Sequence, residues 1–197
     1  LCTNHHRRAF ILAGDESEGQ RLCDDLSAMG MHPLVFPMRD FTFRDAEGAS
    51  HEYEHQRIQT LARILNGECD AVITCLDAAL QYAIPPEELH KRTVTISAGQ
   101  SIPMEQVVSA LLACGYERAA QIDGTGQFSQ RGGILDIFTP DASNPVRLEY
   151  WGDEIDTLSL FDLETQRRTE SIDKLTIAPA VEALIDDPQI LSQKIQK

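Results

Sequence analysis

Residues 126–138 read GQFSQRGGILDIF and contain two strand-like runs separated by Gly132 and Gly133. A strand that stops, turns on two glycines and restarts predicts a β-hairpin. The basic residue Arg131 stands directly at this break rather than on a surface helix. The position of Arg131 therefore raises the question of what an arginine does at a turn in so acidic a chain.

Two further strand-like runs follow along the chain. They read PVRLEYW (145–151) and EIDTLSLF (154–161), and the residues between them, Gly152 and Asp153, form a two-residue hairpin signal. Little helical pattern interrupts these runs. The sequence therefore predicts an antiparallel sheet in this half of the chain.

A strand and a helix precede this sheet. KRTVTIS (91–97) has the pattern of a strand, and residues 102–116 have that of a helix with apolar side chains facing inward. Those inward side chains are predicted to be Met104, Val107, Val108, Leu111 and Leu112. We therefore expect residues 91–178 to form an α+β domain with one helix on an antiparallel sheet.

The first 90 residues have a different organisation. RAFILAG (8–14), HPLVFP (32–37) and DAVITCL (70–76) are short apolar runs separated by amphipathic helical patterns. Such alternation predicts a parallel sheet covered by helices, which is the α/β class. Residues 179–197 are predicted to be a linker that enters a helix and returns to this first domain.

Composition excludes some classes of function. The net charge is −14, with 31 acidic residues against 17 Lys and Arg, and this argues against broad nucleic-acid binding. Five cysteines are scattered without a CxxC pair, which is typical of reduced thiols in a cytoplasmic protein. We expect no membrane span and no signal peptide. The chain begins with leucine, and we expect it to be a piece of a longer protein.

The sequence carries no recognisable nucleotide-binding motif. Neither GxGxxG nor GxxxxGK[ST] occurs. After the first predicted strand, LAGDESEG (12–19) offers acidic side chains where a phosphate requires N–H groups and a lysine. We therefore predict that this chain neither binds nor hydrolyses ATP and needs no cofactor.

One stretch matches a zinc-protease motif literally. HEYEH (51–55) has the form HExxH. It falls at the predicted start of a helix, and no third ligand stands at an obvious downstream position. We interpret it as a polar first turn whose acidic residues are favoured by the helix dipole, with a metal site as the alternative that a zinc measurement decides.

An acidic residue, Asp136, interrupts the apolar run ILDIF (134–138). The period of two in a strand places Asp136 on the face opposite to Leu135 and Ile137. A carboxylate there needs a partner, and Arg147 on the following run is the natural cross-strand candidate. We expect a structural ion pair rather than a catalytic acid.

Several motifs occur together in a fixed order: Tyr116-x-Arg118, Phe128-x-x-Arg131-Gly, ILDIF, VRLEYWGDEID and FDLETQR. In this combination the chain resembles the UvrB-homology module of bacterial transcription-repair coupling factors (Mfd), and in looser form UvrB itself. The resemblance also extends over RIQTLARIL and AVITCLDAALQYAIPPEEL in the first half. UvrB would carry a Tyr-rich insertion where this chain has only residues 38–50, which favours the coupling factor.

The resemblance implies a partial, degenerate helicase-like domain with an inserted α+β domain that binds UvrA, the damage-recognition ATPase. It implies no zinc site, and it places the motor and the contacts with RNA polymerase and DNA in other domains. The UvrA-contacting residues of the family fall on Arg118 and Arg131, with Phe128 nearby. Ser129 and Glu117 stand where relatives often have arginine, and both lower the local positive charge.

The resulting functional prediction is a non-catalytic adaptor that docks UvrA and so recruits nucleotide excision repair to stalled RNA polymerase. An arginine fixed at a turn presents a planar donor fork suited to carboxylates of a partner. Three alternatives stay open. The chain could be a fragment of a UvrB-type helicase that handles damaged DNA, it could be a metal hydrolase, or Arg118 and Arg131 could simply pair with nearby acidic residues.

Overall fold

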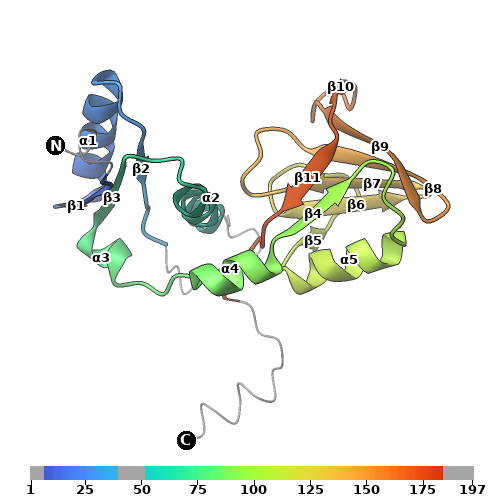
Figure 1. Ribbon diagram of the computed structural model, residues 1–197, viewed down its shortest axis with the longest axis horizontal. Helices are drawn as coiled ribbons and strands as arrows, with labels where there is room; N and C mark the ends of the chain where they lie inside the picture. Colours follow the sequence, from blue (N-terminus) through green and yellow to red (C-terminus); the bar gives the residue numbers. More distant parts are fainter. Residues whose placement is uncertain (1–6, 40–51, 184–197) are drawn as a thin grey trace, which may run out of the picture. The chain divides into compact units, whose positions relative to one another are not determined.

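The computed structural model describes residues 7–39 and 52–183. The chain divides into two compact units, Leu1–Leu89 and His90–Lys197 (Figure 1). Most of the segment predicted to return to the first domain, residues 184–197, lies outside the described residues. Its path therefore stays a prediction.

The first unit is built on a parallel sheet of three strands. The strands are β1 (Ala9–Ala13), β2 (Pro33–Val35) and β3 (Ala71–Cys75), in the order β1-β3-β2. The central strand β3 is buried along its whole length, as its continuous apolar sequence requires. The predicted α/β class is confirmed.

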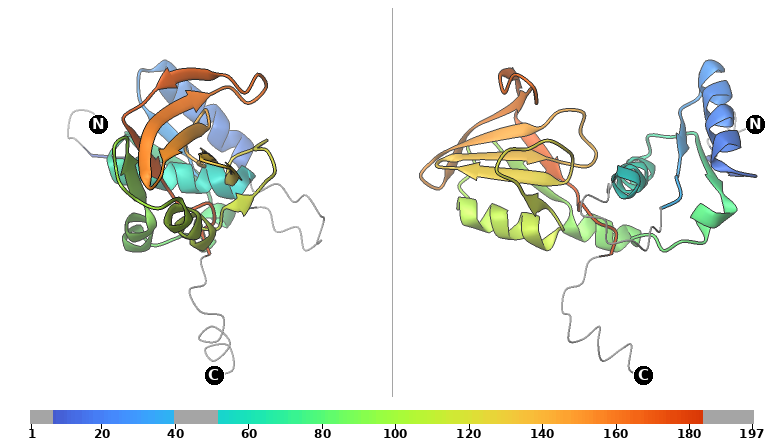
Figure 2. Two further views of the ribbon diagram at one scale, coloured as in Figure 1. Left: turned by 90° about the vertical axis from the view of Figure 1, so that its right-hand side faces the viewer. Right: turned by 180° about the vertical axis from the view of Figure 1, so that it is seen from behind.

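Helix α1 (Glu16–Ala28) lies on one face of this sheet and α2 (Glu52–Asn66) on the other (Figures 1 and 2). The α2 side is not covered at β1, where Phe10 and Leu12 are 67% and 55% exposed. In α1 the buried Gly19 lies against Ile73 of β3. On the opposite face, Ile64 of α2 packs with Val72. Two short helices, α3 (Leu76–Ala79) and α4 (Pro86–Arg92), follow β3. Adjacent residues of β3 thus point to different helices, which is the reason for its two-sided burial.

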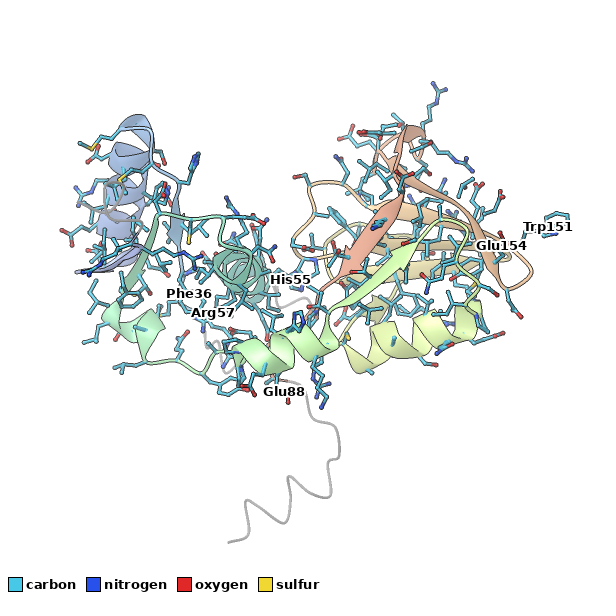
Figure 3. The ribbon with its side chains drawn as sticks, viewed as in Figure 1. Phe36, His55, Arg57, Glu88, Trp151 and Glu154 are labelled. Carbon is cyan, nitrogen blue, oxygen red and sulfur yellow. The ribbon has the colours of Figure 1, made fainter. Side chains whose placement is uncertain are left out.

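An arginine that the sequence did not single out is fully buried in this unit. The guanidinium of Arg57 in α2 donates to the carbonyls of Pro37 at 2.8 Å and Tyr82 at 3.0 Å. It also lies over the ring of Phe36, 4.1 Å from the centroid (Figure 3). Arg57 therefore joins the segment after β2 to the segment after α3.

The second unit is built on a sheet of six strands in the order β10-β9-β8-β7-β6-β5. The strands are β5 (Glu117–Arg118), β6 (Gln127–Arg131), β7 (Ile134–Phe138), β8 (Val146–Trp151), β9 (Glu154–Phe161) and β10 (Arg168–Ser171). All neighbours are antiparallel except β5 and β6, which are parallel. The predicted antiparallel sheet is confirmed, whereas the parallel edge strand was not foreseen.

One face of this sheet is covered along its length and the other only in part. On the second face, Ile122, Phe138 and Phe161 form a small buried cluster, whereas Arg131 and Trp151 at the other end of that face are exposed. Helix α5 (Met104–Ala113) and the antiparallel pair β4 (Val94–Ser97) and β11 (Lys174–Ile177) enclose a single core with the sheet. We call this side of the sheet the helix face and the opposite side the open face (Figure 2). Core residues on the helix face include Phe128, Leu135, Ile137, Val146, Leu148 and Leu158.

The helical stripe predicted for residues 102–116 is correct in part. Val107, Val108 and Leu111 of α5 are buried in the core, as expected. Leu112 was expected there too, but its side chain is 54% exposed. The prediction for Leu112 is wrong because the sheet covers a narrower strip of the helix than the apolar sequence suggests.

Candidate protein-docking face of the antiparallel sheet

The β6–β7 hairpin places Arg131 at the end of the open face. Arg131 is paired with Ile134, so that Gly132 and Gly133 form the two-residue turn, as predicted. Gly132 has a φ of 57°, which favours glycine. The backbone N–H of Tyr150 in β8 donates to the carbonyl of Gly133 at 2.8 Å. This bond holds the turn against β8, so the backbone that carries Arg131 has a fixed position.

The predicted ion pair lies beside this turn. Asp136 of β7 and Arg147 of β8 are cross-strand partners. The guanidinium of Arg147 donates from Nε to Oδ1 of Asp136 at 2.7 Å and from Nη2 to Oδ2 at 2.9 Å. These bonds to Asp136 raise the pKa of Arg147 above its ordinary value. The prediction is confirmed, and Asp136 is more deeply buried than expected, at 2% exposure.

Arg131 shares the same carboxylate. Its Nη2 lies 3.2 Å from Oδ2 of Asp136, while its side chain is 53% exposed. Two arginines thus face one buried carboxylate, so this cluster of three side chains carries one net positive charge. Arg131 does pair with an acidic residue, as one alternative held. That residue, Asp136, already accepts two hydrogen bonds from Arg147.

An exposed tryptophan stands at the same end of the sheet. Trp151 is the last residue of β8, next to the β8–β9 turn, and is 84% exposed (Figure 3). Because side chains alternate along β8, Trp151 shares the open face with Arg147 and Glu149, whereas Leu148 and Tyr150 contact the core. Sequence reasoning missed this residue, although the chain's single tryptophan directly before a Gly-Asp turn was a usable signal.

Arg118 lies on the other side of the sheet. Its Nη2 donates to Oε1 of Gln130 at 3.0 Å, and Cζ is 5.4 Å from the ring centroid of Phe128. Gln130 in turn donates to the sulfur of Met104, the first residue of α5. Arg118 therefore occupies the edge strand β5 on the helix face, and it does not meet Arg131.

Phe128 is part of the core. It has no exposed surface and packs among the residues beneath α5. A direct contact with a partner would require the core to open. Of the three residues that the resemblance singled out, Arg118 and Arg131 are exposed, and Phe128 supports Arg118 from inside.

In the first unit, acidic side chains occupy the loop after β1 and the first turn of α1. Glu18 Oε2 accepts from the backbone N–H of Gly14 at 2.6 Å, and Asp15 Oδ1 accepts from the N–H of Glu18 at 2.7 Å. Glu16 accepts from the N–H of Met38 at 2.7 Å. A phosphate would need these N–H groups as donors. The chain's own carboxylates hold them instead.

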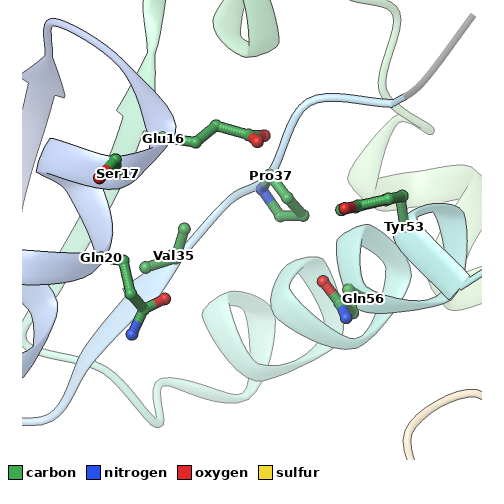
Figure 4. A pocket seen from close by; sticks show the side chains of 7 residues that line it. All are labelled: Glu16, Ser17, Gln20, Val35, Pro37, Tyr53 and Gln56. Atoms are coloured by element: carbon green, nitrogen blue, oxygen red, sulfur yellow. The ribbon is translucent and has the colours of Figure 1, made fainter.

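Two pockets lie near this loop. One, of about 350 Å³, is lined by Gly14, Asp15, Glu16, Ser17, Met38, Cys75 and Asp77. The other, of about 310 Å³, lies between α1 and α2 and is lined by Glu16, Ser17, Gln20, Val35, Pro37, Tyr53 and Gln56 (Figure 4). Neither lining contains a lysine or an arginine, so both pockets disfavour an anionic ligand.

The HExxH match falls only partly on the described residues. His51 lies outside them, and Glu52 begins α2, so that Glu52 and Glu54 stand in its first turn. Within residues 7–39 and 52–183, no group of three or more His, Cys, Asp or Glu side chains is arranged to hold a metal ion. None of the helices in the described ranges is long and apolar enough to cross a membrane.

Comparison with known families identifies the class of the second unit. Residues 94–182 match the model of the UvrB interaction domain, and this segment therefore belongs to that family. The match covers the sheet, α5 and the β4–β11 pair, which are the elements that form the open face and its supporting core.

Over most of its length, the chain is similar to the transcription-repair-coupling factors. It is 31% identical over 188 residues to that of Bacillus subtilis (strain 168), which is 94% of this chain and 16% of the relative. The coupling factor of Staphylococcus aureus (strain MRSA252) is 31% identical over 155 residues, 79% of this chain and 13% of the relative. The predicted resemblance is confirmed, and the chain spans about one sixth or less of the relatives' length.

Proposed function

We propose that this chain is a non-catalytic docking module that binds UvrA for a transcription-repair coupling protein. The observation that carries the proposal is the open face of a UvrB interaction domain, on which Arg131 and Trp151 are exposed at one end of the sheet. Arginine and tryptophan are the residue types most enriched among interface hot spots. Both stand on paired strands, which hold them at fixed positions.

The exposed guanidinium of Arg131 favours an acidic contact on UvrA. Asp136 accepts two hydrogen bonds from Arg147. Within the described residues, the side chain of Arg131 donates one hydrogen bond, to Asp136, so most of its donors are available. A guanidinium in this state suits a carboxylate, which it can bind with two parallel hydrogen bonds. Trp151 adds apolar area beside it. Arg118 supplies a second, separate contact from the edge strand, with Phe128 beneath it.

In the complete protein, this module would bring UvrA to a stalled RNA polymerase and so start nucleotide excision repair in the cytoplasm. We assign ATP-driven translocation on DNA and the contacts with RNA polymerase and DNA to other domains. The acidic loop after β1 supports an absence of nucleotide turnover in the first unit, since Glu18 holds the N–H of Gly14.

The alternative is a UvrB-type helicase fragment that contacts damaged DNA. The net charge of −14 and the short segment at residues 38–50 favour the coupling factor over this alternative. The two functions differ in what the isolated chain binds. A docking module binds UvrA and no DNA, whereas a UvrB-type fragment binds damaged DNA directly.

The deciding experiment is calorimetric titration of the chain with UvrA from the same organism and, separately, with a damaged DNA duplex. We expect saturable binding to UvrA and none to the duplex. Binding to the duplex without UvrA would favour the UvrB-type alternative. An absence of binding to UvrA, with the chain folded by circular dichroism, would overturn the proposal.

A further inference from the structure

The β9–β10 connection contains an unusual backbone conformation. Gln166 has a φ of 58° and is the only non-glycine residue with a positive φ in the described part of the chain. Such a conformation costs free energy for a residue with a side chain. It is held by local bonds, because the N–H of Gln166 donates to the carbonyl of Asp162 at 2.8 Å and Asp162 Oδ1 accepts from the N–H and hydroxyl of Thr165.

This conformation directs Gln166 onto Arg147. The carbonyl of Gln166 accepts from Nη1 of Arg147 at 3.3 Å, and its side-chain Oε1 lies 3.4 Å from Nη2. The side-chain amide of Gln166 also donates to the carbonyl of Leu163 at 2.8 Å, which orients it. The Cζ atom of Arg147 also lies 4.5 Å from the ring centroid of Phe161. Arg147 is therefore held on one side by Asp136 and on the other by Gln166.

The two arginines around Asp136 consequently differ in role. Arg147 uses most of its donors within the fold and is only 12% exposed. Arg131 makes a single bond to Asp136 and is 53% exposed. A buried carboxylate must keep a cationic partner. As long as Arg147 fills that need, Arg131 can exchange its bond to Asp136 for one to a partner at little cost.

We propose that Gln166 is a positioning residue for docking: by fixing Arg147 on Asp136, it leaves Arg131 available to an acidic group of the partner. This inference rests on the proposed function and adds the way in which the open face is kept ready. When Gln166 no longer holds Arg147, Asp136 draws Arg131 inward, and docking weakens although Gln166 itself touches no partner.

The first test is a double-mutant cycle with UvrA. Gln166→Ala removes the amide, and Gln166→Gly removes it while suiting the positive φ. We expect each to lower the affinity about fivefold in the parent and to have no further effect in an Arg131→Ala background. Thr169→Ala, at an exposed position of β10, is the matched control and should leave affinity unchanged. Equal losses in both backgrounds, or no loss in either, would overturn the inference.

The second test needs no UvrA. Nitrogen-15 relaxation of the arginine Nε–H groups measures the order of each guanidinium in the chain alone. We expect Gln166→Ala to make Arg147 more mobile and Arg131 more ordered, because Arg131 becomes a main partner of Asp136. Unchanged order at Arg131 refutes the positioning role. If the parent chain does not bind UvrA, the proposed function fails, and this measurement still decides the inference.

Discussion

The guanidinium groups of Arg118 and Arg131 lie on opposite faces of one sheet. Arg118 contacts Gln130 and Phe128 on the side covered by α5, and Arg131 contacts Asp136 on the open face. A flat partner surface laid on the open face meets Arg131 directly, whereas Arg118 is within reach only around the β5 edge. The two arginines should therefore contribute unequally to docking.

We expect Arg131→Ala to weaken UvrA binding by roughly 2–5 kcal/mol, the range for one member of an interfacial charge pair, and Arg118→Ala to weaken it less. Neither side chain fills the core, so the free energy of unfolding should change by about 0.5 kcal/mol or less. Calorimetric titration gives the affinities, and thermal melts of the same samples give the stability. If both variants bind like the parent and melt normally, the docking face lies elsewhere.

Trp151 offers a direct signal of docking because it is the chain's only tryptophan. Its side chain is 84% exposed, so burial against a partner should shift its fluorescence to shorter wavelength. Trp151→Ala should cost about 2 kcal/mol or more of affinity, as for a hot spot, and leave stability unchanged. To remove the signal of UvrA, the experiment uses UvrA whose own tryptophans have been replaced by phenylalanine. An unchanged emission spectrum at saturating UvrA would place Trp151 outside the interface.

The fold was predictable because its signals are local. The continuous apolar run around Ile73 required a strand buried on both sides, and Gly132 with Gly133 required a turn. A local pattern does not show how much of the surface of α5 the sheet covers. Leu112 was therefore wrongly placed in the core. The parallel pairing of β5 with β6 was likewise missed, since two residues carry no periodicity.

The site was less predictable than the fold. The pairing of Asp136 with Arg147 followed from strand alternation, a rule that needs only the sequence. The separation of Arg118 from Arg131 did not, because it depends on the register of β5 against β6, which pairs Arg118 with Phe128. The role of Gln166 had no sequence signal at all, since a glutamine with positive φ departs from the residue preferences of that conformation.

Asp136 should be important for stability as well as for docking. It is buried and accepts hydrogen bonds from two arginines, so Asp136→Ala leaves Arg147 without its main partner. Removal of one member of a buried pair costs about 3–5 kcal/mol, to be measured by urea denaturation. Replacing both residues, as Asp136→Leu with Arg147→Met, should recover part of the loss. A single variant as stable as the parent would contradict the assigned structural role.

ATP should have no effect on this chain. The N–H groups of Gly14 and Glu18 are bonded to the carboxylates of Glu18 and Asp15, and the pockets beside them are lined without lysine or arginine. The melting temperature with millimolar Mg-ATP should therefore equal that without it, since a ligand stabilises only the state that it binds. Saturable ATP binding at micromolar affinity in a calorimeter would contradict this prediction.

Tyr150 should make the second unit sensitive to high pH. Burial raises the pKa of its hydroxyl to about 12, and that hydroxyl is buried without a hydrogen-bond partner in the described part of the chain. Between the ordinary tyrosine pKa of about 10 and this value, the folded state binds more protons than the unfolded state. The contribution of Tyr150 to the free energy of unfolding is therefore fully present below pH 10 and is lost as the pH rises toward 12.

Tyr150→Phe isolates this effect, because it keeps the ring and removes the ionisable group. Urea midpoints of the parent and the variant should be similar at pH 8, or slightly higher for the variant, since no hydrogen bond is lost. Between pH 10 and 11.5 the parent should lose more stability than Tyr150→Phe. Tyr116, whose pKa burial also raises, contributes equally to both proteins and cancels in the comparison. Parallel curves over this range would show that Tyr150 ionises as readily in the folded chain as in the unfolded one.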